Sequence, residues 1–183
     1  MAQAKNSLPL KKLVAGAVVL AGATVCVNLL LAPTSVTQLD SSAVGAITNE
    51  ATFKTTLGDG SRAIHVFLSS ECTFCRKLEP ELAHLENVTV YRHMLPGRTE
   101  TSRRLAVDVW CSKDPAEEWQ RIAAGRPAGL ATCDATALEK NQALVQRLKL
   151  TYTPSIVYAD GHVSTGMLSS GEIAENISKA GAR

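Results

Sequence analysis

The sequence carries little net charge, and this limits the partners that it is suited to bind. Its 183 residues have a formal net charge of +2, which is too small to indicate a nucleic-acid partner. The sequence also lacks a phosphate-binding loop, an internal repeat and a cluster of metal-ligating residues. We therefore expect no metal and no other cofactor. The length and composition indicate one globular domain with a short appendage.

Cysteine is sparse, and its spacing argues against a zinc site. Cys72 and Cys75 form one Cys-x-x-Cys motif, but Cys111 and Cys133 stand alone, with no histidine three or four residues from either. A structural zinc site would need a second ligand pair of similarly tight spacing. A lone histidine such as His93, which follows a predicted strand, is more often a surface or core residue than a catalytic one.

The Cys-x-x-Cys motif lies where a predicted strand meets a predicted helix. The apolar stretch 64–68 ends just before Cys72, and a helical pattern of leucines follows Cys75. The unpaired N–H groups and the positive dipole end of a helix start would lower the pKa of the Cys72 thiol from its free value of about 8.5. Cys75, one turn further on, could then attack a mixed disulfide formed at Cys72. This arrangement predicts a redox centre.

The N-terminal part predicts export. Lysines within residues 1–12 precede an apolar stretch at 13–32, which is about as long as a bilayer-spanning helix. Positive charge before the apolar stretch predicts a signal anchor, with residues 1–12 in the cytoplasm and the rest of the chain exported. A cleaved signal peptide is the alternative, although a small-x-small cleavage site is hard to find. Either way the later cysteines enter a compartment where disulfides persist. The polar residues 33–46 indicate a linker.

Residues 47–183 show alternating strand and helix patterns that end in a hairpin. This order predicts an α/β domain, with a mixed central sheet flanked by helices and an inserted helical segment at about 99–150. An Asp-Gly turn joins the hairpin strands, and a Ser-x-x-Glu capping box precedes the last helix. The expected helices cover 49–57, 72–85, 100–124 in two parts, 134–148 and 171–179, and the expected strands cover 64–68, 88–91, 155–158 and 162–164.

Thr153-Pro154 lies just before the predicted hairpin. The dipeptide alone favours a trans proline that starts an edge strand, but a turn proline there could also be cis. At this point the sequence resembles the thioredoxin superfamily, in which a cis-proline loop faces a Cys-x-x-Cys motif. More specifically, residues 63–180 are similar to the bacterial periplasmic disulfide isomerases of the DsbC and DsbG type. Pro80 matches the kink proline in the helix of many members of the superfamily. The features that match the isomerases are Val66-Phe67 through Cys75, Val109 to Asp114, Ala124-Gly125, Ala131 to Asp134, Thr153-Pro154 and the Asp160-Gly161 hairpin.

The resemblance implies roles for six residues. Cys72 would be the attacking thiolate, Cys75 the resolving thiol, and Thr153 with a cis Pro154 the platform for substrate backbone. By the same resemblance, Cys111 and Cys133 would form a structural disulfide, with two free buried thiols as the alternative. Closing a loop of that length would stabilise the fold by roughly 3 kcal/mol in the chain-entropy account.

Two features depart from the family pattern. The family has an N-terminal dimerisation domain of strands, whereas the membrane segment and short linker occupy that space here, so we expect a monomer. In addition, Glu71 directly precedes the nucleophile and would raise the pKa of Cys72 unless its carboxylate points to solvent. Arg76 and Lys77 would act in the opposite direction.

The function that the resemblance implies is a thiol-disulfide oxidoreductase that reduces or isomerises disulfides of exported proteins. It would be anchored on the periplasmic side of the bacterial inner membrane, or soluble in the periplasm after cleavage, and would draw electrons from a membrane donor of the DsbD kind. A dedicated disulfide-handling factor of a secretion or conjugation apparatus is an alternative with the same chemistry. A thiol-based copper metallochaperone is a second, disfavoured because the exported part has just two methionines, Met94 and Met167.

Overall fold

The computed structural model describes residues 36–182. The predicted cytoplasmic segment 1–12 and signal anchor 13–32 lie outside these residues. Within residues 36–182, no helix combines the length and the hydrophobicity that crossing a bilayer requires.

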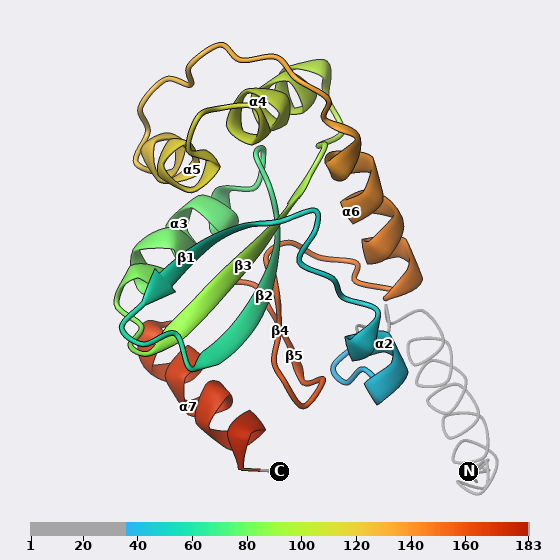
Figure 1. The fold of residues 1–183 in the computed structure, drawn as a ribbon, viewed down its shortest axis with the longest axis vertical. Coiled ribbons are helices and arrows are strands. Elements are labelled where there is room, and N and C mark those ends of the chain that lie inside the picture. Colours follow the sequence, from blue (N-terminus) through green and yellow to red (C-terminus); the bar gives the residue numbers. More distant parts are fainter. Residues whose placement is uncertain (1–35, 183) are drawn as a thin grey trace, which may run out of the picture. The chain divides into compact units, whose positions relative to one another are not determined.

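A mixed five-stranded sheet forms the centre of the domain (Figure 1). The strand order is β1-β3-β2-β4-β5. β2 and β3 pair in parallel, and the other neighbouring strands pair antiparallel. The mixed sheet predicted from the order of elements is therefore confirmed. The strands are β1 (Phe53–Leu57), β2 (Arg62–Ser69), β3 (Val88–Leu95), β4 (Ser155–Val157) and β5 (Val163–Thr165).

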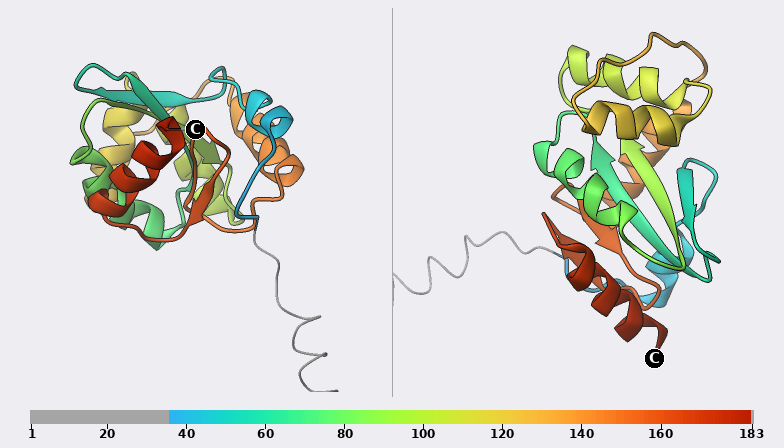
Figure 2. Two further views of the ribbon diagram at one scale, coloured as in Figure 1. Left: turned by 90° about the horizontal axis from the view of Figure 1, so that it is seen from below. Right: turned by 90° about the vertical axis from the view of Figure 1, so that its left-hand side faces the viewer.

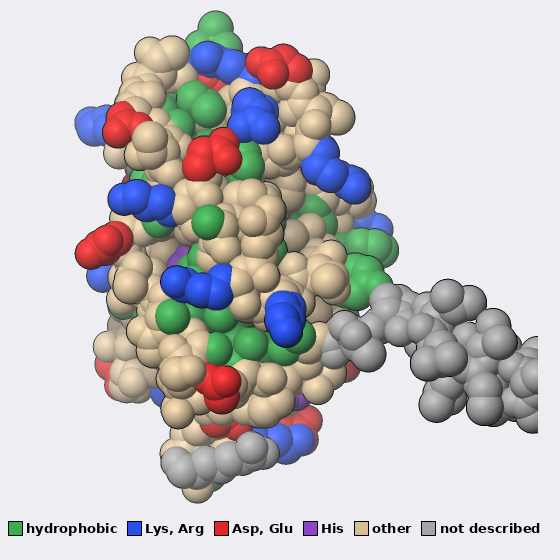
Figure 3. Space-filling model, turned by 90° about the vertical axis from the view of Figure 1, so that its right-hand side faces the viewer, with side chains coloured by type: hydrophobic (Ala, Val, Ile, Leu, Met, Phe, Trp, Pro, Cys, Tyr) green, Lys and Arg blue, Asp and Glu red, His purple; other side chains and the backbone are tan. Residues whose placement is uncertain are grey.

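Helices cover both faces of this sheet. Two views at right angles show α3 and α7 on one face and α6 with α2 on the other (Figure 2). On the surface formed by α6 and α2, basic and acidic side chains are dispersed among neutral atoms (Figure 3). The helices are α2 (Ser41–Gly45), α3 (Thr73–Ala83), α4 (Glu100–Trp110), α5 (Pro115–Ala123), α6 (Thr136–Arg147) and α7 (Ser170–Gly181).

Strand β2 is apolar over most of its length, and its residues from Val66 to Ser69 are buried because both faces are covered there. Alternate residues such as Ile64 and Val66 pack in the larger core with α3, α5 and α7. Phe67 points to the opposite face and packs in the smaller core with Leu144 of α6 and with Leu148, which follows that helix. Burial on both faces fixes the position of the end of β2. The Cys-x-x-Cys motif follows shortly after this strand.

The predicted helix at 49–57 is wrong, because residues 53–57 form strand β1. Thr55 and Thr56 are β-branched and therefore suit a pleated strand. Antiparallel pairing with β3, from Phe53 opposite Arg92 to Leu57 opposite Val88, supplies hydrogen bonds that the isolated sequence does not reveal.

Part of the predicted linker 33–46 belongs to the domain. Leu39 is buried in the smaller core, and Asp40 caps α2 by accepting a hydrogen bond from the Ala43 backbone N–H at 2.8 Å. The backbone on either side of Gln38 bonds to the β4–β5 hairpin: the Val163 N–H donates to Thr37 O, and the Leu39 N–H donates to Gly161 O. The serines and threonines of this stretch indicate a linker, but its few apolar residues pack against the domain.

A buried ion pair joins α3 to β3. Arg92 donates from Nε and Nη2 to the two carboxylate oxygens of Glu79, at 3.0 and 2.8 Å. The Trp119 indole N–H of α5 also donates to Glu79, and Arg92 donates to Thr55 Oγ1 of β1. Each charged group is thus paired and hydrogen-bonded, which a buried ion pair needs in order to be tolerated.

The opposite face of the sheet contains a pair of histidines, of which His93 is fully buried and His65 is half-buried. Nδ1 of His65 lies 3.0 Å from Nε2 of His93, whose Nδ1 lies 3.1 Å from the Asn141 side-chain oxygen. The Asn141 amide nitrogen donates to the carbonyls of Ala51 and Met94, so its oxygen must accept from His93 Nδ1–H. A neutral His93 then accepts from His65 Nδ1–H. His93 is therefore a core residue, as its isolation in the sequence indicated.

Candidate active site

Cys72 lies at the junction between β2 and α3. It is the N-cap of α3, and its Sγ accepts a hydrogen bond from the Cys75 backbone N–H at 3.1 Å. Its side chain is half-buried, whereas Cys75 is 1% exposed. The two cysteines are paired as a disulfide with a Cα–Cα distance of 5.2 Å. When this disulfide is reduced, Cys72 is the thiol that another protein can reach.

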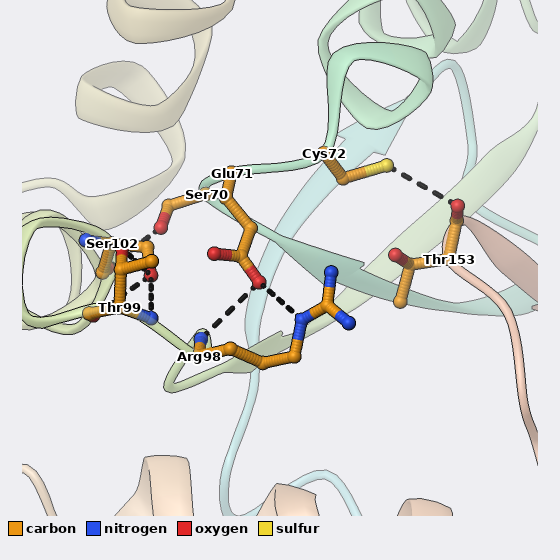
Figure 4. A network of polar contacts seen from close by, with 7 residues as sticks. All are labelled: Ser70, Glu71, Cys72, Arg98, Thr99, Ser102 and Thr153. Carbon is orange, nitrogen blue, oxygen red and sulfur yellow. Dashed lines mark hydrogen bonds and ion pairs between the residues drawn. The ribbon is translucent and has the colours of Figure 1, made fainter.

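The Thr153-Pro154 loop faces Cys72 although 81 residues separate Thr153 from it. Cys72 Sγ lies 3.2 Å from the Thr153 carbonyl oxygen, and the peptide bond that precedes Pro154 is cis (Figure 4). Sheet topology explains the proximity. Because β4 runs antiparallel to β2, with Ser155 opposite Phe67, the start of β4 lies beside the end of β2.

The turn between β2 and Cys72 is bonded to the start of α4 (Figure 4). Ser70 Oγ donates to the Ser102 carbonyl at 2.7 Å. The Glu71 carboxylate accepts from the backbone N–H and from Nε of Arg98, at 3.2 and 3.3 Å. Burial alone would raise the pKa of Glu71, but hydrogen bonds with Ser102 and Arg98 outweigh it and lower that pKa below its ordinary value. Glu71 is thus paired rather than directed to solvent, and no local sequence signal identified Arg98 as its partner.

Exposed apolar side chains lie on the segments next to Cys72 and to the Thr153-Pro154 loop. Phe74, between the two cysteines, is 55% exposed, and Tyr152, next to Thr153, is 48% exposed. Met167 is 42% exposed and follows Gly166, whose N–H donates to the Pro154 carbonyl at 2.9 Å. Sequence reasoning did not single out these three side chains, because an isolated apolar residue carries no signal of exposure.

Cys111 and Cys133 form a disulfide within the helical segment between β3 and β4. Their Cα atoms are 5.4 Å apart, and the bond ties the end of α4 to the loop that precedes α6. Two carboxylates also hold this loop. Glu118 Oε1 accepts from the Gly129 N–H at 2.7 Å, and Asp108 Oδ1 accepts from the Ala131 N–H at 3.0 Å. The disulfide is therefore one of several links that order the loop.

Replacing Cys111 and Cys133 together by Ala should lower stability while sparing activity. The disulfide closes a sequence separation of 22 residues. Its loss should remove about 3 kcal/mol, or roughly 5 to 10 °C in melting temperature. Thermal unfolding followed by circular dichroism checks the first part, and insulin reduction below the melting temperature checks the second. Free thiols at both positions in protein purified from an oxidising compartment would contradict the structural role.

Comparison with known proteins agrees with this geometry. Residues 50–181 match the family described as thioredoxin-like domain. The chain belongs to the thioredoxin-like family. The mixed sheet and its helices are therefore those of a thioredoxin-like fold, as the sequence resemblance implied.

Several relatives of this thioredoxin-like chain are named for disulfide interchange. A probable thiol:disulfide interchange protein DsbC from Bordetella parapertussis is 34% identical over 117 residues, which are 63% of this chain and 42% of that protein. The Escherichia coli protein of that name is 27% identical over 107 residues, or 56% of this chain and 45% of that protein. The resemblance to DsbC-type proteins is confirmed. The chain spans less than half the length of these curated relatives.

Solved structures share the fold of this thioredoxin-like chain. A disulfide interchange protein from Neisseria gonorrhoeae aligns with a TM-score of 0.66 and 27% identity, over 73% of this chain and 98% of that chain. Proteus mirabilis ScsC in a transitional conformation aligns with a TM-score of 0.67 and 19% identity, over 94% of this chain and 91% of that chain. At 19% identity, the second likeness shows the fold alone.

Proposed function

We propose that this chain is a thiol-disulfide oxidoreductase that acts on disulfides of exported proteins. One observation carries the proposal. The half-buried Cys72 lies at a helix start, beside the Thr153 carbonyl and in front of the buried Cys75. An accessible thiol at a helix N-terminus has the features of an attacking thiolate, and a buried neighbour one turn away has those of a resolving thiol. The similarity to DsbC-type proteins supports the same chemistry.

The reduced form would act in two steps. The Cys72 thiolate attacks one sulfur of a client disulfide, which forms a mixed disulfide and releases the other client sulfur as a thiolate. Cys75 then loses its proton and attacks Cys72 Sγ, which forms the Cys72–Cys75 disulfide and releases the second client thiolate. The client gains two electrons and the protein loses two. In isomerisation a different client thiolate attacks the mixed disulfide instead, which forms a new client disulfide, releases Cys72 as a thiolate and moves no net electrons.

Local geometry favours the first step. The Cys75 N–H that donates to Cys72 Sγ would stabilise the thiolate, as would the positive end of the α3 dipole. The exposed Phe74, Tyr152 and Met167 would contact apolar residues that flank a client cysteine. The loop at Thr153 and Pro154 would align the extended backbone of the client beside the sulfur.

The setting of this reaction is also part of the proposal. Export into the periplasm is supported by the apolar stretch at 13–32 and by the similarity to DsbC-type proteins. Anchoring to the inner membrane, the monomeric state and a membrane electron donor of the DsbD kind remain predictions from the sequence. A reducing donor is needed because each round of client reduction leaves Cys72 and Cys75 oxidised.

Insulin reduction tests the chemistry. The full-length chain with dithiothreitol should accelerate precipitation of the insulin B chain at least tenfold over dithiothreitol alone, because Cys72 is pre-positioned for attack. The variant with Cys72 and Cys75 both replaced by Ser is the matched control and should match the background rate. Stoichiometric retention of copper by the reduced chain, without insulin reduction, would instead support the metallochaperone.

A further inference from the structure

Two side chains connect the turn before Cys72 to the start of α4. Ser70 bonds to the Ser102 carbonyl inside the molecule, and Glu71 bonds to Arg98 at the surface (Figure 4). The Arg98 side chain is 94% exposed, and that of Glu71 is 27% exposed. Such an exposed ion pair adds little to folding stability. Its position beside the nucleophile indicates a different role.

The geometry of the β3–α4 turn aims Arg98 at Glu71. Gly97 has a φ of +76°, and a Cβ at this position would lie 2.4 Å from Ser102 Oγ, so the turn requires glycine. Thr99 caps α4 by accepting from the Ser102 N–H at 3.1 Å. The backbone N–H of Arg98 is therefore directed at the carboxylate by a tight turn, and the guanidinium adds a second bond and a positive charge.

The Glu71 carboxylate would disfavour a thiolate at the next residue if it were free to move toward it. A nearby negative charge raises the pKa of a thiol, whereas a nearby positive charge lowers it. In Figure 4 the Glu71 carboxylate turns toward Arg98, and the Cys72 sulfur turns toward Thr153. The two side chains thus leave the same turn in different directions.

We propose that Arg98 is a positioning residue for the redox centre, which holds the Glu71 carboxylate at the start of α4 and offsets its charge beside the Cys72 thiolate. The proposal rests on the attacking role of Cys72 in the proposed function. It makes Arg98, which lies 26 residues further along the chain, part of the machinery that keeps Cys72 reactive at neutral pH.

Charged groups near the turn also come from α3 and from the first turn of α4, where Glu100 follows Thr99. Arg76 donates from Nη2 to the Ser70 carbonyl at 2.8 Å, and Lys77 follows it on the exposed side of the helix. Both α3 cations act on Cys72 without pairing to Glu71, so Arg98 can be tested separately from them.

The test is the titration of Cys72 in the reduced full-length chain, with Cys75→Ser in every variant so that one active-site thiol is measured. Thiolate absorbance and the rate of alkylation by iodoacetamide both report the pKa of Cys72 as pH is varied. Arg98→Ala should raise this pKa by about half to one unit, because the carboxylate loses its bond to the guanidinium, keeps only the weaker hold of the backbone N–H, and its charge is no longer offset. Arg98→Lys should restore most of the loss, and Glu71→Gln should lower the pKa.

A double variant separates positioning from a direct effect of the arginine charge. In the Glu71→Gln background, Arg98→Ala should shift the pKa of Cys72 by less than half as much, because no carboxylate remains to be held. Arg103→Ala is the matched control, since Arg103 pairs with Glu139 on α6. It should leave the pKa of Cys72 unchanged.

Two results would overturn the proposal: equal shifts in both backgrounds, or no shift in either. The thiol titration does not depend on client turnover. A chain that shows the Arg98 shift but does not reduce insulin would therefore refute the proposed function and leave the role of Arg98 standing.

Discussion

Replacing Cys72 by Ser is expected to abolish insulin reduction, whereas replacing Cys75 by Ser is expected to trap the protein in mixed disulfides with its clients. The difference follows from exposure, because Cys72 is half-buried at the helix start and Cys75 is 1% exposed beneath it. A client can reach the first sulfur, and the second can act only on a bond formed at the first. The activity of Cys72→Ser should fall at least tenfold, to the background rate.

The two variants are compared in the insulin assay and on non-reducing gels of proteins trapped in cells. The Cys75→Ser adducts should disappear on reduction and should be absent when Cys72 is also replaced. The Cys111→Ala and Cys133→Ala double variant is a control for general loss of thiols. Equal residual activity of the Cys72→Ser and Cys75→Ser variants would show that the assigned roles are wrong.

Lowering the pH from 6.5 toward 4 is expected to destabilise the fold strongly through the buried histidine pair. Burial lowers the pKa of His93 from 6.5 to about 4, and the neighbouring His65 adds to this lowering. Burial likewise lowers the pKa of His65 to about 4. Protonated His93 would place an Nε2–H against the Nδ1–H of His65, so the hydrogen-bond chain to Asn141 favours neutral rings.

The direction of this change in stability follows from the pH at which the folded and unfolded states bind protons. The unfolded chain protonates its histidines near pH 6.5, whereas the folded chain protonates this pair only near pH 4. The free energy of unfolding therefore falls as pH drops through this window, and it is fully retained above pH 6.5. The fully buried His93 alone would lower the free energy of unfolding by on the order of 3 kcal/mol at low pH.

Denaturant unfolding at several pH values between 7 and 4 measures this loss. His65→Phe removes one titrating ring but keeps an aromatic ring next to Tyr91, on which His65 stacks. This variant should be less stable at pH 7, because His93 loses its hydrogen-bond donor. The further decrease in its free energy of unfolding between pH 7 and pH 4 should be about half that of the natural chain. His84→Gln, at an exposed position, is the matched control. A natural chain whose stability is flat between pH 6.5 and 4 would contradict the role of the pair.

The local parts of the candidate site could be predicted because each signal lies within a few residues. The Cys-x-x-Cys motif marks the strand-to-helix junction, and Asp160-Gly161 marks the turn of the hairpin formed by β4 and β5. The capping box of Ser169 and Glu172 correctly located the last helix. In each case one short-range rule determines the backbone.

The contacts that could not be predicted join distant segments. Arg98 reaches Glu71 across 27 residues, and nothing near either residue indicates the other. A helix was predicted at 49–57, but pairing with β3 makes Phe53–Leu57 a strand. Its partner strand lies about 35 residues away, so the residues near 53–57 do not reveal the pairing.

The short segment before α2 also protects the sheet. Strand β5 is the last strand in the order, and residues 37–39 bond to it and to the adjoining turn. A strand edge with unpaired N–H and C=O groups can pair with another molecule and start aggregation. A chain shortened to begin at residue 47 would uncover this edge and the buried neighbours of Leu39 together. Residues 37–39 therefore also reduce the tendency of the domain to associate with itself through the edge of β5.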